Sequence, residues 1–222
     1  EVAEMKAELD EAQFLAKAGN GINQQLIATK LRWIMRHEPQ VFARIATVFG
    51  SYDYINWRLT GERAIEQNWA LEAGFVDVAR GELDNGLIAL TGLARDAIPP
   101  KAISHWVLGH LTAEASLATG LTEGTPVAGG AADLIASALG AGITQRGDVL
   151  LKFGGSVDIL IATDKVVPDS RMFLDYHLVP GLYMPNGCMS TGGSGLNWFA
   201  NSFCGGLAPE AKVKGLTIHQ YL

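Results

Sequence analysis

A single carboxylate at the predicted junction of a strand and a helix is the residue of this chain best placed for chemistry. Asp133 follows a short apolar stretch, 126–128, and a turn of small residues, 129–132, and it opens an apolar helix that ends near Gly140. In an open α/β sheet, ligands bind where strands end and helices begin. Asp is also among the best helix N-caps, so the local sequence leaves both roles open.

A glycine loop further along the chain is a candidate phosphate site. Gly154-Gly155-Ser156 separates two apolar stretches, 149–153 and 157–163, which predicts a β-hairpin with the glycines at its tip. Backbone N–H groups in such a turn can converge on an anion. The same glycines suit an ordinary hairpin turn, and the sequence does not choose between these roles.

A second glycine loop, Gly192-Gly193-Ser194-Gly195, precedes a predicted helix over 196–203. A helix N-terminus carries free N–H groups and the positive end of the helix dipole, so this loop is another candidate anion site. The markers of P-loop, dinucleotide-binding and α/β-hydrolase chemistry are missing, since no GxxxxGK[ST], no GxGxxG between a strand and a helix and no GxSxG occur.

The composition is that of a globular protein that handles small molecules. Of the 222 residues, 48% are hydrophobic and 18% are charged, and the net charge is -6. No lysine- or arginine-rich face suggests nucleic acid as a partner, and no apolar run or signal peptide suggests a membrane. Cys188 and Cys204 lack metal-ligand spacing, which favours reduced thiols and a cytoplasmic location.

Helical periodicity characterises the first part of the chain. Residues 1–17 have apolar positions every three to four residues and are expected to form one amphipathic helix. A second helix is expected over 22–37, stopped by Pro39. Trp33 and Trp57 are expected to pack in the core between the helices.

After residue 146 the pattern changes to strands, and we place a domain boundary there, between 1–146 and 147–222. The first residue lies within a charged helical pattern and the last within an apolar run. We therefore expect the chain to be a piece of a longer protein.

Several short motifs follow one another along nearly the whole chain: Thr29-Lys30-Leu31-Arg32-Trp33 with Glu38-Pro39, Asp53-Tyr54 with Arg58-Leu59-Thr60-Gly61-Glu62, Thr119-Gly120-Leu121, Thr125-Pro126-Val127, and Asp133. In this order they resemble the FGGY carbohydrate kinases, in particular pentulose kinases of the xylulokinase type. The resemblance implies the α/β fold of the actin and hexokinase group, two ribonuclease-H-like domains that close on a cleft. Residues 1–146 would be the later part of the sugar-binding domain, and 147–222 the beginning of the nucleotide-binding domain.

The resemblance also implies roles on the sugar side. Asp133 matches the family's general base, which accepts the proton of the attacking sugar hydroxyl. Leu134 stands at the neighbouring substrate-binding position, where relatives often carry Asn or Gln. Trp69 and Leu71 differ from an Asn-Ala-Ser motif that is common in the family.

On the nucleotide side, Gly154, Gly155 and Ser156 match the family's loop at the terminal phosphates, with Gly155 in place of the usual threonine. Gly193 and Asn197 match nucleotide-contacting positions. The family's N-terminal phosphate hairpin and its later adenine-side glycines do not occur in this chain.

These matches predict an ATP-dependent kinase that transfers the γ-phosphoryl group to a hydroxyl of a pentulose or related polyol. The expected partners are the sugar and ATP with Mg²⁺, without a metal held by the protein itself, and the resemblance allows a homodimer. The departures at Leu134 and Gly155 support an alternative, a non-catalytic nucleotide- or sugar-binding relative.

Overall fold

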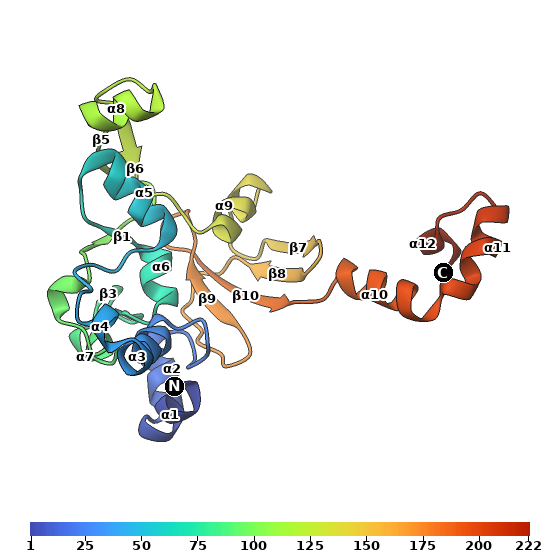
Figure 1. Ribbon diagram of the computed structural model, residues 1–222, viewed down its shortest axis with the longest axis horizontal. Helices are drawn as coiled ribbons and strands as arrows, with labels where there is room; N and C mark the ends of the chain where they lie inside the picture. Colours follow the sequence, from blue (N-terminus) through green and yellow to red (C-terminus); the bar gives the residue numbers. More distant parts are fainter.

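Helices and pairs of very short strands make up the first 140 residues of the computed structural model, which describes residues 1–222 (Figure 1). The elements in chain order are α1 (Val2–Glu8), α2 (Glu11–Ala18), α3 (Ile27–His37), α4 (Pro39–Phe42), α5 (Ser51–Thr60), β1 (Ile65–Glu66), α6 (Gln67–Glu72), β2 (Val76–Asp77), β3 (Glu82–Leu83), α7 (Asn85–Ala89), η1 (Arg95–Ala97), β4 (Lys101–Ala102), β5 (Val107–His110), α8 (Ala113–Thr119), β6 (Pro126–Ala128) and α9 (Asp133–Gly140). Strand β1 pairs with β4 in parallel, while β2–β3 and β5–β6 are antiparallel pairs.

A four-stranded antiparallel sheet follows, with the strand order β7-β8-β10-β9. It leads into a helical arm that extends away from the body of the molecule (Figure 1). The elements are β7 (Val149–Phe153), β8 (Val157–Ile161), β9 (Phe173–Tyr176), β10 (Tyr183–Met189), α10 (Gly193–Phe203), η2 (Gly205–Leu207), α11 (Ala208–Val213) and α12 (Ile218–Tyr221).

The edge strand β9 is joined to the helical part by two asparagine side chains. Asn20 donates to the carbonyl of Leu174 at 3.0 Å and accepts from its N–H at 2.8 Å. Asn68, fully buried in α6, accepts from the N–H of Tyr176 at 2.6 Å. Because these side chains satisfy the backbone of the outer edge of the sheet, β9 can be buried against α6.

The apolar core follows the same junction. Its largest cluster joins α6 and its neighbours to Leu174 of β9, and comprises Ile65, Ala70, Leu71, Ala73, Phe75, Val76, Val78, Ile88, Ile98 and Leu174. Burial of this cluster therefore fixes the sheet against the helical part.

Several sequence predictions are confirmed in detail. The strand 126–128, the helix that opens at Asp133 and the hairpin around Gly154-Gly155-Ser156 are all present. The helix predicted over 196–203 begins three residues earlier, at Gly193. None of the helices combines the length and the apolar character that a membrane-spanning helix needs.

Other predictions are wrong. Residues 1–17 do not form one helix, because Asp10 caps a second helix by accepting from the N–H groups of Ala12 and Gln13. The helix expected over 22–37 begins only at Ile27. Trp33 is 46% exposed and stacks on His37, one turn further along α3, so it is not a core residue.

Candidate functional site

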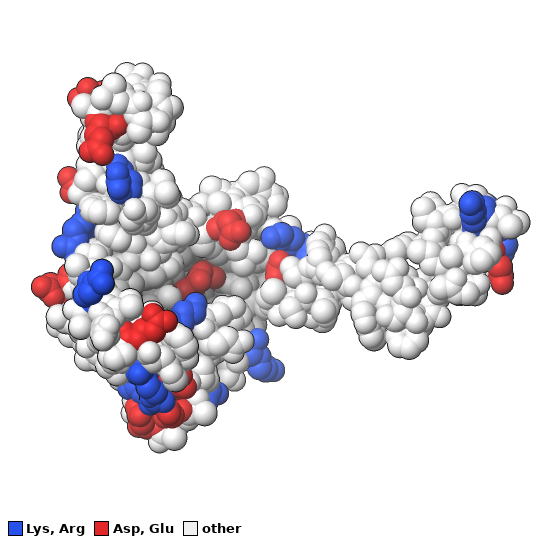
Figure 2. Space-filling view, in the orientation of Figure 1, with Lys and Arg blue, Asp and Glu red and all other residues white.

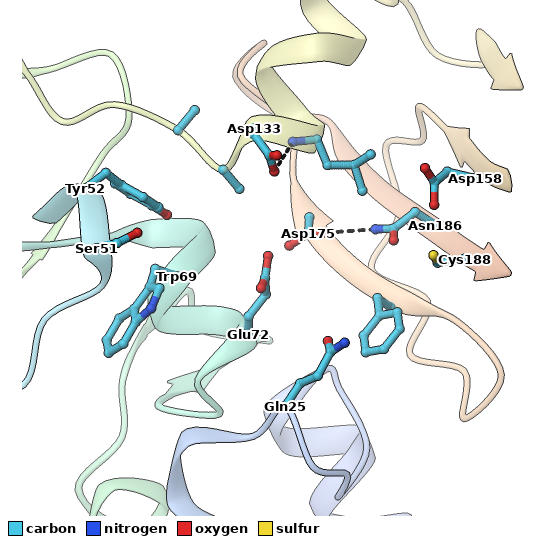
Figure 3. Close-up of a pocket in the computed structure, with 14 residues that line it drawn as sticks. Gln25, Ser51, Tyr52, Trp69, Glu72, Asp133, Asp158, Asp175, Asn186 and Cys188 are labelled. Atoms are coloured by element: carbon cyan, nitrogen blue, oxygen red, sulfur yellow. Dashed lines mark hydrogen bonds between the residues drawn. The ribbon is translucent and has the colours of Figure 1, made fainter. Parts of the chain in front are cut away.

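A cavity of about 720 Å³ lies between the helical part and the four-stranded sheet (Figure 3). Figure 2 shows a hollow in the body of the molecule with acidic atoms inside it. The cavity is lined by residues from both parts of the chain: Gln25, Ser51, Tyr52, Trp69, Glu72, Ala131, Ala132, Asp133, Leu134, Asp158, Phe173, Asp175, Asn186 and Cys188. No Lys, Arg or His is among them.

Asp133 stands on one wall of this cavity, as the first residue of α9. The N-cap is Ala132, and no side chain caps the helix. The Asp133 carboxylate accepts from the N–H of Leu134 at 2.8 Å and is otherwise exposed to the cavity. Leu134, the other sugar-side candidate, lines the cavity beside it.

The turn before Asp133 is held by α5. The side chain of Asn56 donates to the carbonyl of Gly129 at 2.8 Å. Gly129 passes so close to the preceding segment that a Cβ there would lie 2.8 Å from the carbonyl oxygen of Ile103. A glycine is therefore required at this position, and the close approach fixes where α9 begins.

A buried carboxylate positions the opposite wall. Glu66, 1% exposed, caps α6 by accepting from the N–H groups of Asn68 at 2.8 Å and Trp69 at 3.2 Å. The hydroxyls of Tyr52 and Ser104 donate to the same carboxylate. Burial and the Glu66 charge raise the pKa of Tyr52, which keeps its hydroxyl a neutral donor at the cavity wall.

At the other end of α6, Glu72 faces Asp175 of β9 (Figure 3). Asp175 is buried and accepts from the Asn186 amide of β10 at 2.8 Å. Burial, and then the charge of Glu72, raise the pKa of Asp175 well above its ordinary value. Burial also raises the pKa of Glu72, and the charges of Glu66 and Asp133 add to this. The cavity thus contains two interacting carboxyl groups besides Asp133.

A further carboxylate, Asp158, is buried near the start of β8 and also lines the cavity. Asp158 is 3.8 Å from the ammonium of Lys152 on β7. Hydrogen bonding to this carboxylate raises the pKa of the exposed Cys188 thiol on β10. Asp158 is two residues beyond Ser156, a separation of about 7 Å along an extended chain. The hairpin tip therefore lies close to the cavity although it does not line it.

The structure brings the two glycine loops into direct contact. The N–H groups of Gly192 and Gly193 donate to the carbonyls of Gly155 at 2.7 Å and Gly154 at 2.9 Å. The Ser194 hydroxyl also donates to the Gly155 carbonyl, at 2.8 Å. The first N–H groups of α10 are thus largely engaged by the hairpin.

The hairpin itself retains free donors. The N–H groups of Gly155 and Ser156 make no hydrogen bond within the chain, and the loop is largely exposed. They are therefore the groups that can meet an anion here. Asn197 lies on the arm, where its side chain is hydrogen-bonded to His219 at 2.6 Å, and the structure does not bring it to the cavity of Asp133.

Sequence reasoning did not find Glu72, Asp175 or Asn186. They come from three separate elements and meet only through the packing of α6 on the sheet. The only indication in the sequence was the motif at 68–71, where Trp69 and Leu71 replace the residues common in the family. Trp69 lines the same cavity.

Comparison with known proteins agrees with this arrangement. Residues 1–140 match the N-terminal domain of the FGGY family of carbohydrate kinases. The xylulose kinase from Rhodospirillum rubrum is 57% identical, with a TM-score of 0.91 over 96% of this chain and 44% of its own. Its likeness identifies the fold as that of the sugar kinases, the actin and hexokinase type.

Two curated proteins are more distant relatives. The autoinducer-2 kinase of Enterobacter sp. (strain 638) is 28% identical over 92% of this chain and 39% of its own length. The L-xylulose/3-keto-L-gulonate kinase of Escherichia coli (strain K12) is 39% identical over 52% of this chain and 24% of its own. The chain thus spans well under half the length of these relatives. The family match extends over more than half of the chain, which therefore belongs to the FGGY family of carbohydrate kinases.

Proposed function

We propose that this chain is part of an ATP-dependent carbohydrate kinase that phosphorylates a hydroxyl of a pentulose or a related polyol. The observation that supports this most is Asp133, an exposed carboxylate on a cavity of about 720 Å³ that Glu72, Asp175 and Asn186 also line. Such a cavity has the size and polarity for a sugar.

In this proposal Asp133 is the general base. Its carboxylate has one hydrogen bond, to the Leu134 N–H, and the remaining lone pairs face the cavity, where they can accept a hydroxyl proton. Leu134 contributes an apolar contact beside it, which restricts the position of the sugar chain. Trp69 and Tyr52 close the opposite wall.

ATP would be held at the contact between the two glycine loops. The free N–H groups of Gly155 and Ser156 suit phosphate oxygens, and Gly193 maintains the contact between the loops. When bound, ATP supplies the phosphoryl group, and Mg²⁺ is carried largely by its phosphates. The proposed boundary at residue 146 places the nucleotide loops and Asn197 of the arm in the second domain, while residues of both domains line the sugar cavity.

The test is Asp133→Asn in the full-length protein. Asn cannot accept a proton, but its oxygen can keep the hydrogen bond to Leu134, and the residue is not the N-cap. We expect kcat to fall by on the order of a hundred- to ten-thousand-fold. The free energy of unfolding should change by less than about 1 kcal/mol.

The matched control is Asp164→Asn, which removes one carboxylate from an exposed surface ion pair with Arg146. It should retain wild-type turnover. Near-normal kcat in Asp133→Asn would refute the general-base role. A wild-type protein that binds sugar and ATP but transfers no phosphate to any ketose would favour the non-catalytic alternative.

A further inference from the structure

The position of the Asp133 carboxylate is set from outside its own helix. No side chain caps α9, and the carboxylate bonds only to the N–H of Leu134, the next residue in the chain. A bond to an adjacent residue moves with the helix and does not fix the helix in space. The place of Asp133 therefore depends on the turn that precedes α9 and on the surface against which α9 packs.

Three backbone groups of that turn are bonded to other parts of the chain. The N–H groups of Gly129 and Gly130 donate to the carbonyls of Trp106 at 2.9 Å and Ser104 at 3.0 Å. The third group is the carbonyl of Gly129, which accepts from the side-chain amide of Asn56 on α5 at 2.8 Å. Asn56 thus supplies the only side-chain hydrogen bond to the turn.

The same face of α5 also reaches the opposite wall of the cavity. A Cβ at Gly130 would lie 3.8 Å from both Asn56 and Tyr52, which are one helical turn apart, so the turn packs on this face. The Tyr52 hydroxyl donates at 2.9 Å to Glu66, the residue that caps α6. Helix α6 carries Trp69 of the opposite wall. One face of α5 therefore connects the turn of Asp133 to the α6 wall.

The body of α9 belongs to the other side of the cavity. Its buried residues Ile135 and Ala138 pack in one cluster with Leu160 of β8 and Met184 of β10. Apolar contacts of this kind have no preferred direction. A hydrogen bond does have one, so the bond from Asn56 specifies where α9 begins relative to the helical part.

We propose that Asn56 is a positioning residue for phosphoryl transfer, which holds the Asp133 carboxylate at the correct place relative to the α6 wall through the carbonyl of Gly129. This inference rests on the proposed kinase function, with Asp133 as the general base. Asn56 does not line the cavity, so it acts through Asp133 and not by touching the sugar. A displacement of about 1 Å at a catalytic group can lower a rate by roughly a hundredfold.

The experiment is Asn56→Ala in the full-length protein, with D- or L-xylulose and ATP varied in turn. We expect kcat to fall by roughly ten- to a hundredfold, because the base is displaced. Both KM values should stay within about threefold, because the groups that contact the substrates remain. The melting temperature shows whether the variant is folded.

A second substitution and a control accompany it. Asn56→Asp keeps the shape of the side chain but replaces the donor by a carboxylate, which repels the Gly129 carbonyl, so it should lower kcat at least as much. It also tests the proposal if Asn56→Ala fails to fold. Ile55→Ala is the matched control, since Ile55 is the neighbouring residue of α5 and is 55% exposed. It should keep wild-type kinetics.

A double variant separates positioning from a purely structural role. If Asn56 acts through Asp133, then Asn56→Ala should lower kcat by less than about threefold when Asp133 is already Asn, since residues that act as a unit are not additive. A structural role would give the same loss in both backgrounds.

Each result decides the inference. A loss of kcat that disappears in the Asp133→Asn background supports it. Normal kcat in the Asn56 variants, or an equal loss in both backgrounds, overturns it while the kinase function stands, provided that Asp133→Asn alone abolishes turnover. Near-normal kcat in Asp133→Asn, or a wild type that phosphorylates no pentulose or polyol, refutes the proposed function and this inference together.

Discussion

At the scale of single residues, Asp53 shows how burial sets the properties of a carboxylate that is outside the cavity. It is 2% exposed and accepts from the N–H groups of Gly50 at 3.1 Å and Glu66 at 2.9 Å. Burial raises the pKa of Asp53 to about 6, the Glu66 charge adds to this, and the two N–H groups oppose it. The side chain thus joins the start of α5 to the start of α6 at an electrostatic cost.

This cost predicts a pH dependence of stability. Since the folded-state pKa of Asp53 exceeds its ordinary value of 3.8, the folded state binds the proton more tightly, and stability should fall as the pH rises from about 4 to about 6. The loss from this one group amounts to about 3 kcal/mol. Asp53→Asn should remove that part of the slope, as measured by urea unfolding of the full-length protein at several pH values.

The absolute stability of Asp53→Asn is less informative, because an amide has one oxygen and cannot accept both N–H groups. The slope is the decisive measurement. Wild type and variant profiles that run parallel between pH 4 and 6 would contradict the assignment. The exposed Asp164→Asn variant should leave the slope as in the wild type.

The difference between Asp133 and Asp175 shows what the sequence reveals at this scale. Asp133 could be predicted because a strand, a turn of small residues and a helix surround it in the sequence. Asp175 could not, because its role depends on Glu72 and Asn186, which lie 103 and 11 positions away. Its own strand, 173–176, reads as an ordinary half-buried segment.

At the scale of elements, the two glycine loops are better understood together than as separate anion sites. A Cβ at Gly193 would lie 2.9 Å from the carbonyl oxygen of Gly154, and one at Gly192 would lie 2.5 Å from a side-chain atom of Val157. These glycines therefore allow α10 to dock on the hairpin. The sequence predicted both loops, but their contact is a tertiary feature that neither loop's sequence contains.

We expect Gly193→Ala to separate the loops and to raise the KM for ATP by roughly tenfold in the full-length protein, since a hydrogen bond to phosphate would be lost. The KM for sugar should change little. Steady-state kinetics with each substrate varied in turn measures both values.

Gly195→Ala is the matched control for this change. It lies in the same helical turn, but a Cβ there would make an ordinary contact of 3.5 Å with Thr191. If Gly193→Ala and Gly195→Ala have equal KM values for ATP, the contact between the loops has no part in nucleotide binding.

The errors in predicted elements also have a physical reason. The apolar residues keep a 3.6-residue periodicity through 1–17. The helix is nevertheless interrupted at Asp10, because the Asp10 side chain caps the N-terminus of a new helix. Trp33 is on the outer face of α3 although its size suggests the core. Periodicity identifies helices, whereas caps and tertiary contacts decide where they end and which face is buried.

At the scale of the whole molecule, the arm presents a large uncovered apolar surface. Trp198 is 63% exposed, Phe203 is 66% and Val213 is 88%. The arm projects from the body with few charged side chains on it (Figure 2). Patches of this kind are usually covered in the folded protein, and the chain spans well under half the length of its relatives.

We therefore expect residues 1–222, produced alone, to self-associate and to transfer no phosphate from ATP to a ketose. Size-exclusion chromatography and a coupled kinase assay measure these properties. Replacing Trp198 and Phe203 by Gln should shift the elution towards the monomer. A monomeric, active 222-residue protein would contradict both expectations.

The two asparagines that hold β9 have a consequence for how the chain is made. Asn20 and Asn68 bond to backbone groups 154 and 108 positions later in the sequence. On a ribosome, both side chains emerge long before Leu174 and Tyr176 have been synthesised. Until then both amides are hydrated, and the α6 wall of the cavity reaches its final form only after most of this chain has been translated.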